Sequence, residues 1–314
     1  MDFWILVIRI IFLSQTTIGI LGNVSLMFYY LVLYYRECTL KPTDLILLHL
    51  MTANSMTIIS LGVPNTMAAF GLMQFFNDLE CRILIYIQTV GRSVSIGTTC
   101  LLSVFQAMTV RPRELCCKDY KVKAENFIGC SISLLWGFYM LIHFVLFVYP
   151  FIKLNSKNMT GKRDFGYCST TGSDEISDSF YAAMVVCPEV FFSVLITWSS
   201  SSMIVILYRH KKRVQHIRSS HGYNRTSPES RATQKILVLV STFLAFYSLS
   251  LILRGCIALL YNHSWWLVNI TPFTSLCFPS FGPFVLMNPC SIIYRLTLIW
   301  IRKKNNLIFF KVHE

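Results

Sequence analysis

The chain has 314 residues, of which 54% are hydrophobic and only 14% are charged, against about 25% charged in ordinary soluble proteins. This composition excludes a disordered chain and argues against a water-soluble globule. The net charge of +13 comes from short segments between long apolar runs, so it indicates membrane sidedness, and we expect no nucleic-acid partner.

Seven long apolar windows follow one another along the chain. Four of them contain no Asp, Glu, Lys or Arg, namely residues 10–33, 45–77, 126–152 and 264–294. Three contain one such residue each, namely 83–110, 179–208 and 236–260. About 20 apolar residues in a helix cross a bilayer. The sequence therefore predicts an all-α membrane protein, a seven-transmembrane helix bundle that forms a single domain over residues 1–314.

The expected spans have approximate limits. We place them at about 8–33, 45–71, 83–110, 126–150, 180–208, 235–260 and 267–294. The first apolar run begins after Arg9 and continues to Leu33, which is too long for the core of a signal peptide. We expect an uncleaved span.

The connections between spans differ strongly in basic charge. Those after spans one, three and five, with the C-terminal tail, hold 20 of the 28 Lys and Arg residues. Lys and Arg mark the cytoplasmic side of a membrane protein. We therefore expect the N-terminus outside and the C-terminus in the cytoplasm, with basic side chains near lipid headgroups.

Two cysteines and one asparagine are expected on the outer face. Cys81 and Cys168 are predicted there, where thiols oxidise, so we expect a disulfide between them; two unpaired thiols are the alternative. The sequence Asn158-Met159-Thr160 is an acceptor pattern for N-glycosylation in the long outer loop. We expect Asn158 to be glycosylated.

Patterns of enzyme chemistry are missing from the sequence. The seven histidines show no metal-ligand spacing, and the chain has no phosphate-cradling glycine loop or nucleophile elbow. We expect no catalytic residues, no metal and no cofactor, and we predict that the protein is not an enzyme. His49 and His143 are lone histidines in spans, and we interpret them as hydrogen-bonded packing groups.

Three ionisable residues lie inside expected spans: Arg92, Glu189 and Arg254. A charge at bilayer depth is costly, so it usually faces the bundle interior and has a partner. At about 1.5 Å per residue, all three lie in the outer half of the bundle, where they are candidates for an outward-facing ligand pocket. The alternative is that Glu189 pairs with one arginine and only fixes helix packing; the two interpretations are compatible. The surplus positive charge favours an anionic or acceptor-bearing ligand.

Several short sequence motifs indicate the class of protein. Residues 19–23 read Gly-Ile-Leu-Gly-Asn, residues 49–55 read His-Leu-Met-Thr-Ala-Asn-Ser, and residues 166–169 read Gly-Tyr-Cys-Ser. Residues 95–107 read Ser-Ile-Gly-Thr-Thr-Cys-Leu-Leu-Ser-Val-Phe-Gln-Ala, and residues 227–234 read Ser-Pro-Glu-Ser-Arg-Ala-Thr-Gln. These runs, with seven spans, resemble the vomeronasal type-1 receptor family of G-protein-coupled receptors over almost the whole chain.

The resemblance implies a function. It implies a chemosensory receptor in the plasma membrane of a chemosensory neuron, which detects small pheromone-like molecules and activates a heterotrimeric G protein of the Gi/Go type. Two features depart from the wider rhodopsin-like pattern. The inner end of span three lacks an acidic-Arg-aromatic triplet, and the Tyr after Asn288-Pro289 comes only at Tyr294.

The expected G-protein surface is the inner end of spans three, five and six. Its basic residues are candidates for contact with an acidic partner or with anionic headgroups: Arg111, Arg113, Arg209, Lys211, Lys212 and Arg213. Two alternatives stay open, a small-molecule transporter or channel and a bitter-taste-type receptor. Against a transporter, the sequence shows no paired repeats.

Overall fold

A computed structural model describes residues 2–37, 41–72, 76–109, 119–154, 162–164, 169–171, 187–218, 228–259 and 265–286. Helix α1 spans Asp2–Glu37, and α2 (Pro42–Thr57), η1 (Ile58–Gly62) and α3 (Val63–Ala69) follow one another without a break. The remaining helices are α4 (Asp78–Thr109), α5 (Asp119–Leu154), α7 (Cys187–Arg218), α8 (Pro228–Leu259) and α9 (Trp265–Leu286). The described residues thus form seven long helical stretches, and the predicted all-α bundle is confirmed.

The helix ends differ from the expected span limits. Helices of 32 residues, such as α4 and α7, are about 48 Å long, whereas the hydrocarbon core is about 30 Å thick. Several helices therefore continue beyond the apolar windows. The seventh span was expected to reach residue 294, but the described helix α9 ends at Leu286, and residues 287–314 lie outside the described part.

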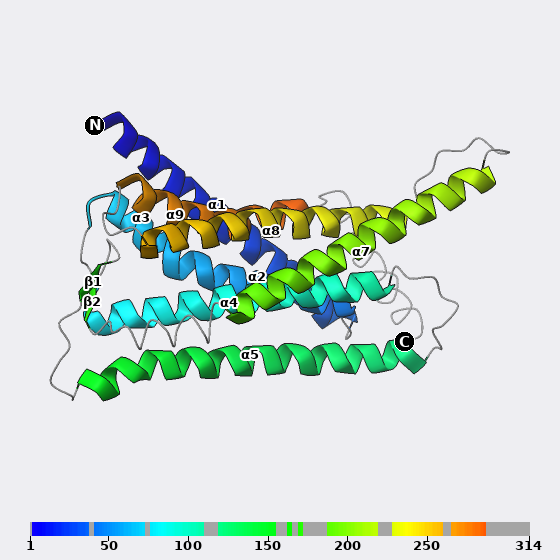
Figure 1. Cartoon of the computed structure of the whole chain (residues 1–314), viewed down its shortest axis with the longest axis horizontal. Coiled ribbons are helices and arrows are strands. Elements are labelled where there is room, and N and C mark those ends of the chain that lie inside the picture. Colours follow the sequence, from blue (N-terminus) through cyan, green and yellow to red (C-terminus); the bar gives the residue numbers. More distant parts are fainter. Residues whose placement is uncertain are drawn as a thin grey trace, which may run out of the picture.

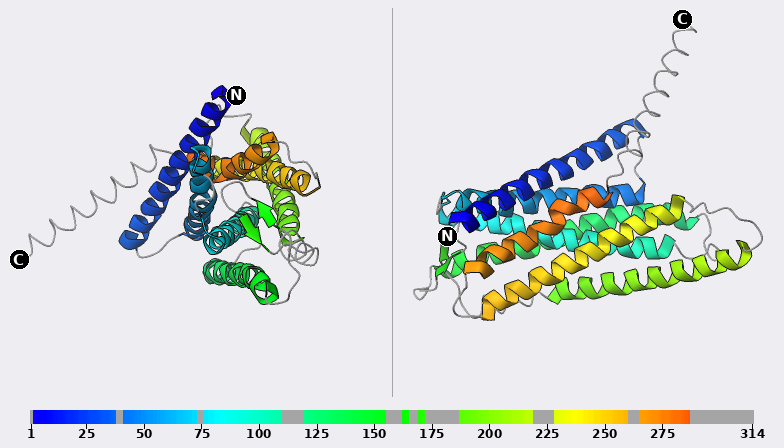
Figure 2. Two further views of the ribbon diagram at one scale, coloured as in Figure 1. Left: turned by 90° about the vertical axis from the view of Figure 1, so that its left-hand side faces the viewer. Right: turned by 90° about the horizontal axis from the view of Figure 1, so that it is seen from above.

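Helix α4 occupies the centre of the bundle. It contacts α2, α5, α7 and α8. Helix α5 lies at one edge of the bundle, and α1 crosses the bundle obliquely (Figure 1). Helix α9 packs against α8 and α1, and the end-on view in Figure 2 shows α4 beside α2 and α5. Residues on α4 are therefore in a position to meet side chains from most of the bundle.

The surface of the bundle is apolar. Large hydrophobic side chains are exposed on α1, α5 and α7, among them Phe28, Leu134 and Trp198. Within the described residues, four stretches are long and apolar enough to cross a membrane: Phe3–Tyr35, Pro42–Ala69, Phe127–Val148 and Cys187–Ile206. An outward-facing apolar belt of this kind suits contact with lipid tails.

Helix α4 carries several polar residues, and these face other helices. Ser93, Thr98, Thr99 and Ser103 are fully buried. Several of these hydroxyls donate to a backbone carbonyl one turn earlier, as Thr99 does to Ser95 at 2.7 Å and Ser103 to Thr99 at 2.9 Å. Polar side chains at the centre of the bundle are thereby satisfied without contact with lipid.

Two prolines shape the helices that surround α4. Pro64 has no N–H and its ring crowds the preceding turn; just before it, η1 widens into a π turn, in which the Val63 N–H donates to the Ile58 carbonyl. In α9, Pro283 leaves the carbonyl of Pro279 without its usual partner on the helix. The buried Asn23 amide of α1 donates to that carbonyl at 2.8 Å, so a neighbouring helix repairs the break.

A short hairpin was not expected from the sequence. Strands β1 (Lys162–Asp164) and β2 (Ser169–Thr171) pair antiparallel, with Arg163 opposite Thr170. Both strands belong to the segment that was expected to be only a long outer loop. The hairpin lies at the end of the bundle where α4 begins (Figure 1), and β2 contacts α4.

Candidate functional site

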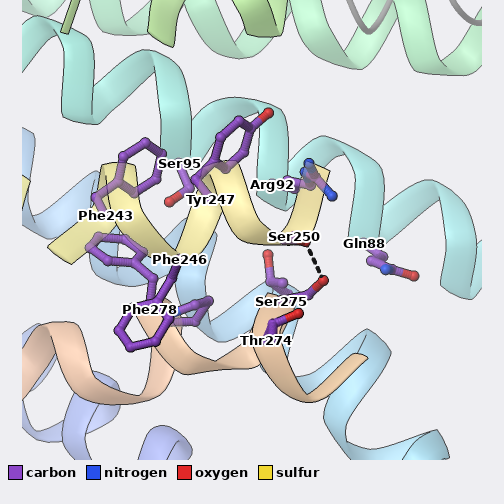
Figure 3. Close-up of a pocket in the computed structure, with 12 residues that line it drawn as sticks. Gln88, Arg92, Ser95, Phe243, Phe246, Tyr247, Ser250, Thr274, Ser275 and Phe278 are labelled. Atoms are coloured by element: carbon purple, nitrogen blue, oxygen red, sulfur yellow. Dashed lines mark hydrogen bonds between the residues drawn. The ribbon is translucent and has the colours of Figure 1, made fainter. Parts of the chain in front are cut away.

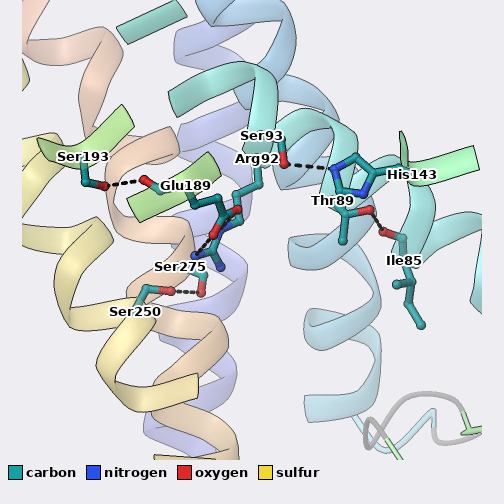
Figure 4. Close-up of polar contacts among 9 residues, drawn as sticks. All are labelled: Ile85, Thr89, Arg92, Ser93, His143, Glu189, Ser193, Ser250 and Ser275. Carbon is teal, nitrogen blue, oxygen red and sulfur yellow. Dashed lines mark hydrogen bonds and ion pairs between the residues drawn. The ribbon is translucent and has the colours of Figure 1, made fainter. Parts of the chain in front are cut away.

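A buried ion pair joins two helices near the centre of the bundle. Arg92 on α4 faces Glu189 in the first turn of α7 (Figure 4), with 3.4 Å between Arg92 Nε and Glu189 Oε1. A second contact, from Arg92 Nη2 to Glu189 Oε2, is also 3.4 Å long. The two side chains are only 12% and 4% exposed. The structure thus brings together two of the three ionisable residues that the sequence singled out.

A third helix contributes an aromatic ring to this pair. The guanidinium carbon of Arg92 lies 4.7 Å from the ring centroid of Tyr247 on α8, within the range of a cation–π interaction. The Tyr247 hydroxyl is buried. Arg92 therefore interacts with α7 through charge and with α8 through an aromatic face.

A cavity opens beside Arg92 and Tyr247. Its internal volume is small, about 30 Å³. Figure 3 shows its lining, which comes from α2, α4, α8 and α9. Phe243, Phe246 and Phe278 form an aromatic wall, with Phe243 and Phe278 edge to face at 4.6 Å between centroids. The rest of the described lining is mostly hydroxyl-bearing. The described residues thus give the cavity the cation of Arg92, an aromatic surface and small polar groups.

A second polar contact lies behind Arg92 on α4. Ser93 Oγ and His143 Nε2 are 3.0 Å apart and buried (Figure 4). Tyr139, one turn earlier on α5, stacks on the His143 ring at 6.1 Å between centroids. His143 is therefore the hydrogen-bonded packing group that was expected, and it joins α5 to α4 beside the residue that carries the charge.

The first turn of α4 is fixed by covalent and ionic contacts. Cys81 is fully buried and disulfide-bonded, and the next residue, Arg82, forms an ion pair with Asp78 at 2.8 Å. Cys168 lies outside the described residues, but β2 begins at the residue after it and contacts α4. This placement favours Cys168 as the partner of Cys81, which stays a prediction.

The other expected site residues are described only in part. The backbone of Arg254 belongs to α8, and those of Lys211, Lys212 and Arg213 to α7, but their side chains lie outside the described part. Arg209 is described and exposed on α7. Arg111, Arg113 and Asn158 lie outside the described residues altogether, so the proposed glycosylation of Asn158 stays a prediction.

Sequence reasoning missed the residues that complete the site. Tyr247 and the three phenylalanines are ordinary members of apolar helices, and Ser250 and Ser275 are two of many serines. Their common feature is that their helices place them around one cavity. That information depends on how α8 and α9 are rotated against α4, which no local pattern in the sequence records.

The arrangement of the helices matches a known class of structure. The chain superposes on squid rhodopsin with a TM-score of 0.68 at 14% sequence identity, over 91% of this chain and 81% of that one. This likeness shows the fold, a seven-transmembrane helix bundle like that of rhodopsin.

The sequence comparisons define the family. Residues 6–298 match the vomeronasal organ pheromone receptor family. The chain is 47% identical to human vomeronasal type-1 receptor 2, over 95% of this chain and 75% of that one, and 46% identical to human vomeronasal type-1 receptor 4, over 92% and 96%. A zebrafish relative, olfactory receptor class A-like protein 1, is 27% identical over 92% of this chain and 90% of its own length.

The chain belongs to the vomeronasal type-1 receptor family. With its rhodopsin-like fold, it is a multi-pass membrane protein and a chemosensory receptor of the G-protein-coupled class. The resemblance seen in the sequence is thereby confirmed.

We predict that Cys81 pairs with Cys168. The bond closes a loop of about ninety residues and stabilises the folded chain by about 4 to 5 kcal/mol on the chain-entropy account. Non-reducing peptide mapping of receptor recovered from the cell surface should yield the linked pair. Cys130, exposed on α5 and free, is the internal control for thiol labelling. Recovery of Cys168 as a free thiol beside Cys130 would show that Cys81 has a different partner.

Proposed function

We propose that this receptor binds small pheromone-like molecules in the cavity beside Arg92 and responds by activating a Gi/Go-type G protein. It acts in the plasma membrane of a chemosensory neuron, as one transmembrane domain with its N-terminus outside. The observation that carries the proposal is a buried cation on the central helix, in the wall of a cavity lined by aromatic rings.

The depth of Arg92 suits a pocket reached from outside. Arg92 lies ten residues beyond Arg82 on the same helix, which is about 15 Å along the axis. The disulfide-bonded Cys81 and the hairpin lie at the same end of α4 as Arg82. With that end outside, as the basic residues indicate, the cavity lies in the outer half of the membrane.

The contacts between Arg92 and Glu189 are long for an ion pair. Good charge-assisted hydrogen bonds between nitrogen and oxygen are about 2.7–2.9 Å long, whereas both Arg92–Glu189 contacts measure 3.4 Å. A carboxylate or carbonyl oxygen entering the cavity competes with Glu189 for the guanidinium. Arg254 on α8 stays part of the proposed pocket as a second positive charge.

The proposed G-protein surface lies at the opposite end of the helices. Helix α7 continues to Arg218, beyond the apolar stretch that ends at Ile206, and α8 begins at Pro228. The basic residues of this end are Arg111, Arg113, Arg209, Lys211, Lys212 and Arg213. Their charge attracts an acidic partner and anionic headgroups alike. A transporter, the other function considered from the sequence, would move its ligand across the membrane, whereas a receptor changes GDP release without doing so.

We expect Arg92→Ala to weaken the response to carboxylate ligands by about 10- to 100-fold, because a hydrogen bond to a charged group contributes about 1.5–3 kcal/mol. The response to neutral ligands should change much less. Glu189→Gln should strengthen the response to carboxylates, since it removes the competing negative charge. The measurement is ligand-stimulated nucleotide exchange on a Gi/Go protein reconstituted with the receptor in vesicles.

Arg82→Ala is the matched control, because Arg82 pairs with Asp78 and is absent from the cavity lining. Equal losses in the Arg82 and Arg92 variants, at equal amounts of folded receptor, would place the ligand elsewhere. Transport of the ligand into vesicles without any nucleotide exchange would contradict the receptor mechanism itself.

We expect replacement of Arg209, Lys211, Lys212 and Arg213 by Gln to reduce nucleotide exchange about tenfold at unchanged ligand affinity. Each lost contact with an acidic partner at a partly exposed interface contributes a few tenths to 1 kcal/mol. Replacing Lys153 and Lys157, expected on the outer face, removes basic charge without touching this surface and serves as the control. Unchanged exchange in the first variant would place the coupling surface elsewhere.

A further inference from the structure

Two serines face each other in the wall of the cavity that α8 and α9 form. Ser250 on α8 and Ser275 on α9 are joined by a hydrogen bond of 2.7 Å between their Oγ atoms (Figure 3). Both line the cavity, and Ser250 is only 2% exposed. A polar pair beside the aromatic rings of the cavity is a candidate for recognition of one particular group on the ligand.

The direction of this hydrogen bond follows from the neighbouring contacts. Ser275 Oγ donates to the backbone carbonyl of Thr271, one turn earlier on α9, at 2.8 Å. A serine hydroxyl has one proton and two acceptor lone pairs. Since the proton of Ser275 is directed to Thr271, Ser275 accepts within the pair, and Ser250 donates its only proton to Ser275. Ser250 Oγ therefore retains acceptor capacity and no donor.

Other hydroxyls in the described lining show the same polarity. Thr274 Oγ1 donates to the Thr271 carbonyl at 3.0 Å, Thr57 Oγ1 to the Ala53 carbonyl at 3.1 Å, and Ser95 Oγ to Asn54 Oδ1 at 2.9 Å. Each proton points to a protein acceptor, so oxygen lone pairs are left for the cavity. Among the described lining residues, the other side chains that carry donor groups are those of Gln88, Arg92 and Tyr247. The described hydroxyls of the α8–α9 wall present acceptors.

We propose that the ligand is an apolar molecule with a neutral hydroxyl group, which donates to Ser250 Oγ. This inference rests on the proposed function. A second group on the ligand, a carboxylate or carbonyl, accepts from Arg92. A methyl ether or ketone in place of the hydroxyl offers only another acceptor to Ser250, and two acceptors facing each other in a buried site leave both unsatisfied. An ammonium donor is disfavoured because Arg92 carries positive charge in the same cavity.

The test uses three series of phenylalkanoates, from acetate to hexanoate, with hydrogen, hydroxyl or methoxy at the para position. Purified receptor in lipid nanodiscs is titrated with each compound, and the dissociation constant is measured calorimetrically. For the chain length that fits, the hydroxyl compound should bind about three- to tenfold more tightly than its hydrogen and methoxy partners, the effect of one neutral hydrogen bond.

Variants of the pair separate this mechanism from a general packing effect. Ser250→Ala should abolish the preference for hydroxyl, and Ser250→Thr, which keeps the oxygen, should retain it. Ser275→Ala removes the acceptor of the Ser250 proton, so Ser250 can then donate, and the methoxy compound should gain affinity relative to the hydroxyl compound. Ser241→Ala, on an exposed face of the same helix, should leave all three affinities unchanged.

The possible outcomes separate this inference from the proposed function. Equal affinity for hydroxyl and methoxy compounds, an unchanged preference in Ser250→Ala, or no binding by any hydroxyl compound overturns the inference. If carboxylates that depend on Arg92 still stimulate nucleotide exchange in that case, the proposed function stands. A hydroxyl preference that depends on Ser250, without nucleotide exchange on any G protein, supports the inference and contradicts the proposed function.

Discussion

The cost of placing a guanidinium group inside a membrane protein constrains the whole bundle. Arg92 lies on the central helix, and a charge at that depth must be neutralised and shielded from lipid. Glu189 supplies the opposite charge from α7 and Tyr247 supplies an aromatic face from α8. Two helices are therefore held in register against α4 by one side chain. The same side chain forms part of the cavity wall, so the group that fixes these helices is also the one that we propose to contact a ligand.

Under the proposed function, this double role would connect ligand binding with helix position. A ligand changes a conformational equilibrium only by the difference in its affinity for two states. An acceptor that replaces Glu189 at Arg92 would loosen the contact between α4 and α7. A hydroxyl that donates to Ser250 would add a ligand contact to α8, which Ser250 already joins to α9. Because α7 and α8 both continue toward the basic end of the bundle, a change in their packing at the cavity is transmitted along rigid helices.

The sequence was sufficient for the features that depend on composition and on the cost of buried charge. Long uncharged windows predicted the helices, and the rarity of ionisable residues within them singled out Arg92 and Glu189. Features that depend on packing were not predictable. The π turn at η1 arises from how Pro64 is accommodated, and the contact between Asn23 and the Pro279 carbonyl depends on α1 crossing α9 at one position.

The arrangement of side chains in the site was also not predictable from the sequence. The polarity of the α8–α9 wall depends on which carbonyl each hydroxyl reaches, and that is set by side-chain rotamers and helix rotation. Serine and threonine in an apolar helix usually bond to their own backbone, so their number alone does not predict a recognition surface. Family resemblance indicated the class of receptor, but it did not indicate which side chains meet around the cavity.

The central claim is that Arg92 and Glu189 are energetically coupled within the folded bundle. The most direct measurement is a double-mutant cycle on the melting temperature of the receptor in nanodiscs, with Arg92→Gln, Glu189→Gln and the double variant. Removing one member of a buried pair leaves the other charge uncompensated, at a cost of about 3–5 kcal/mol. We therefore expect a large drop in melting temperature for each single variant and a drop in the double variant well below their sum. Drops that simply add, as they do for independent sites, would contradict the account.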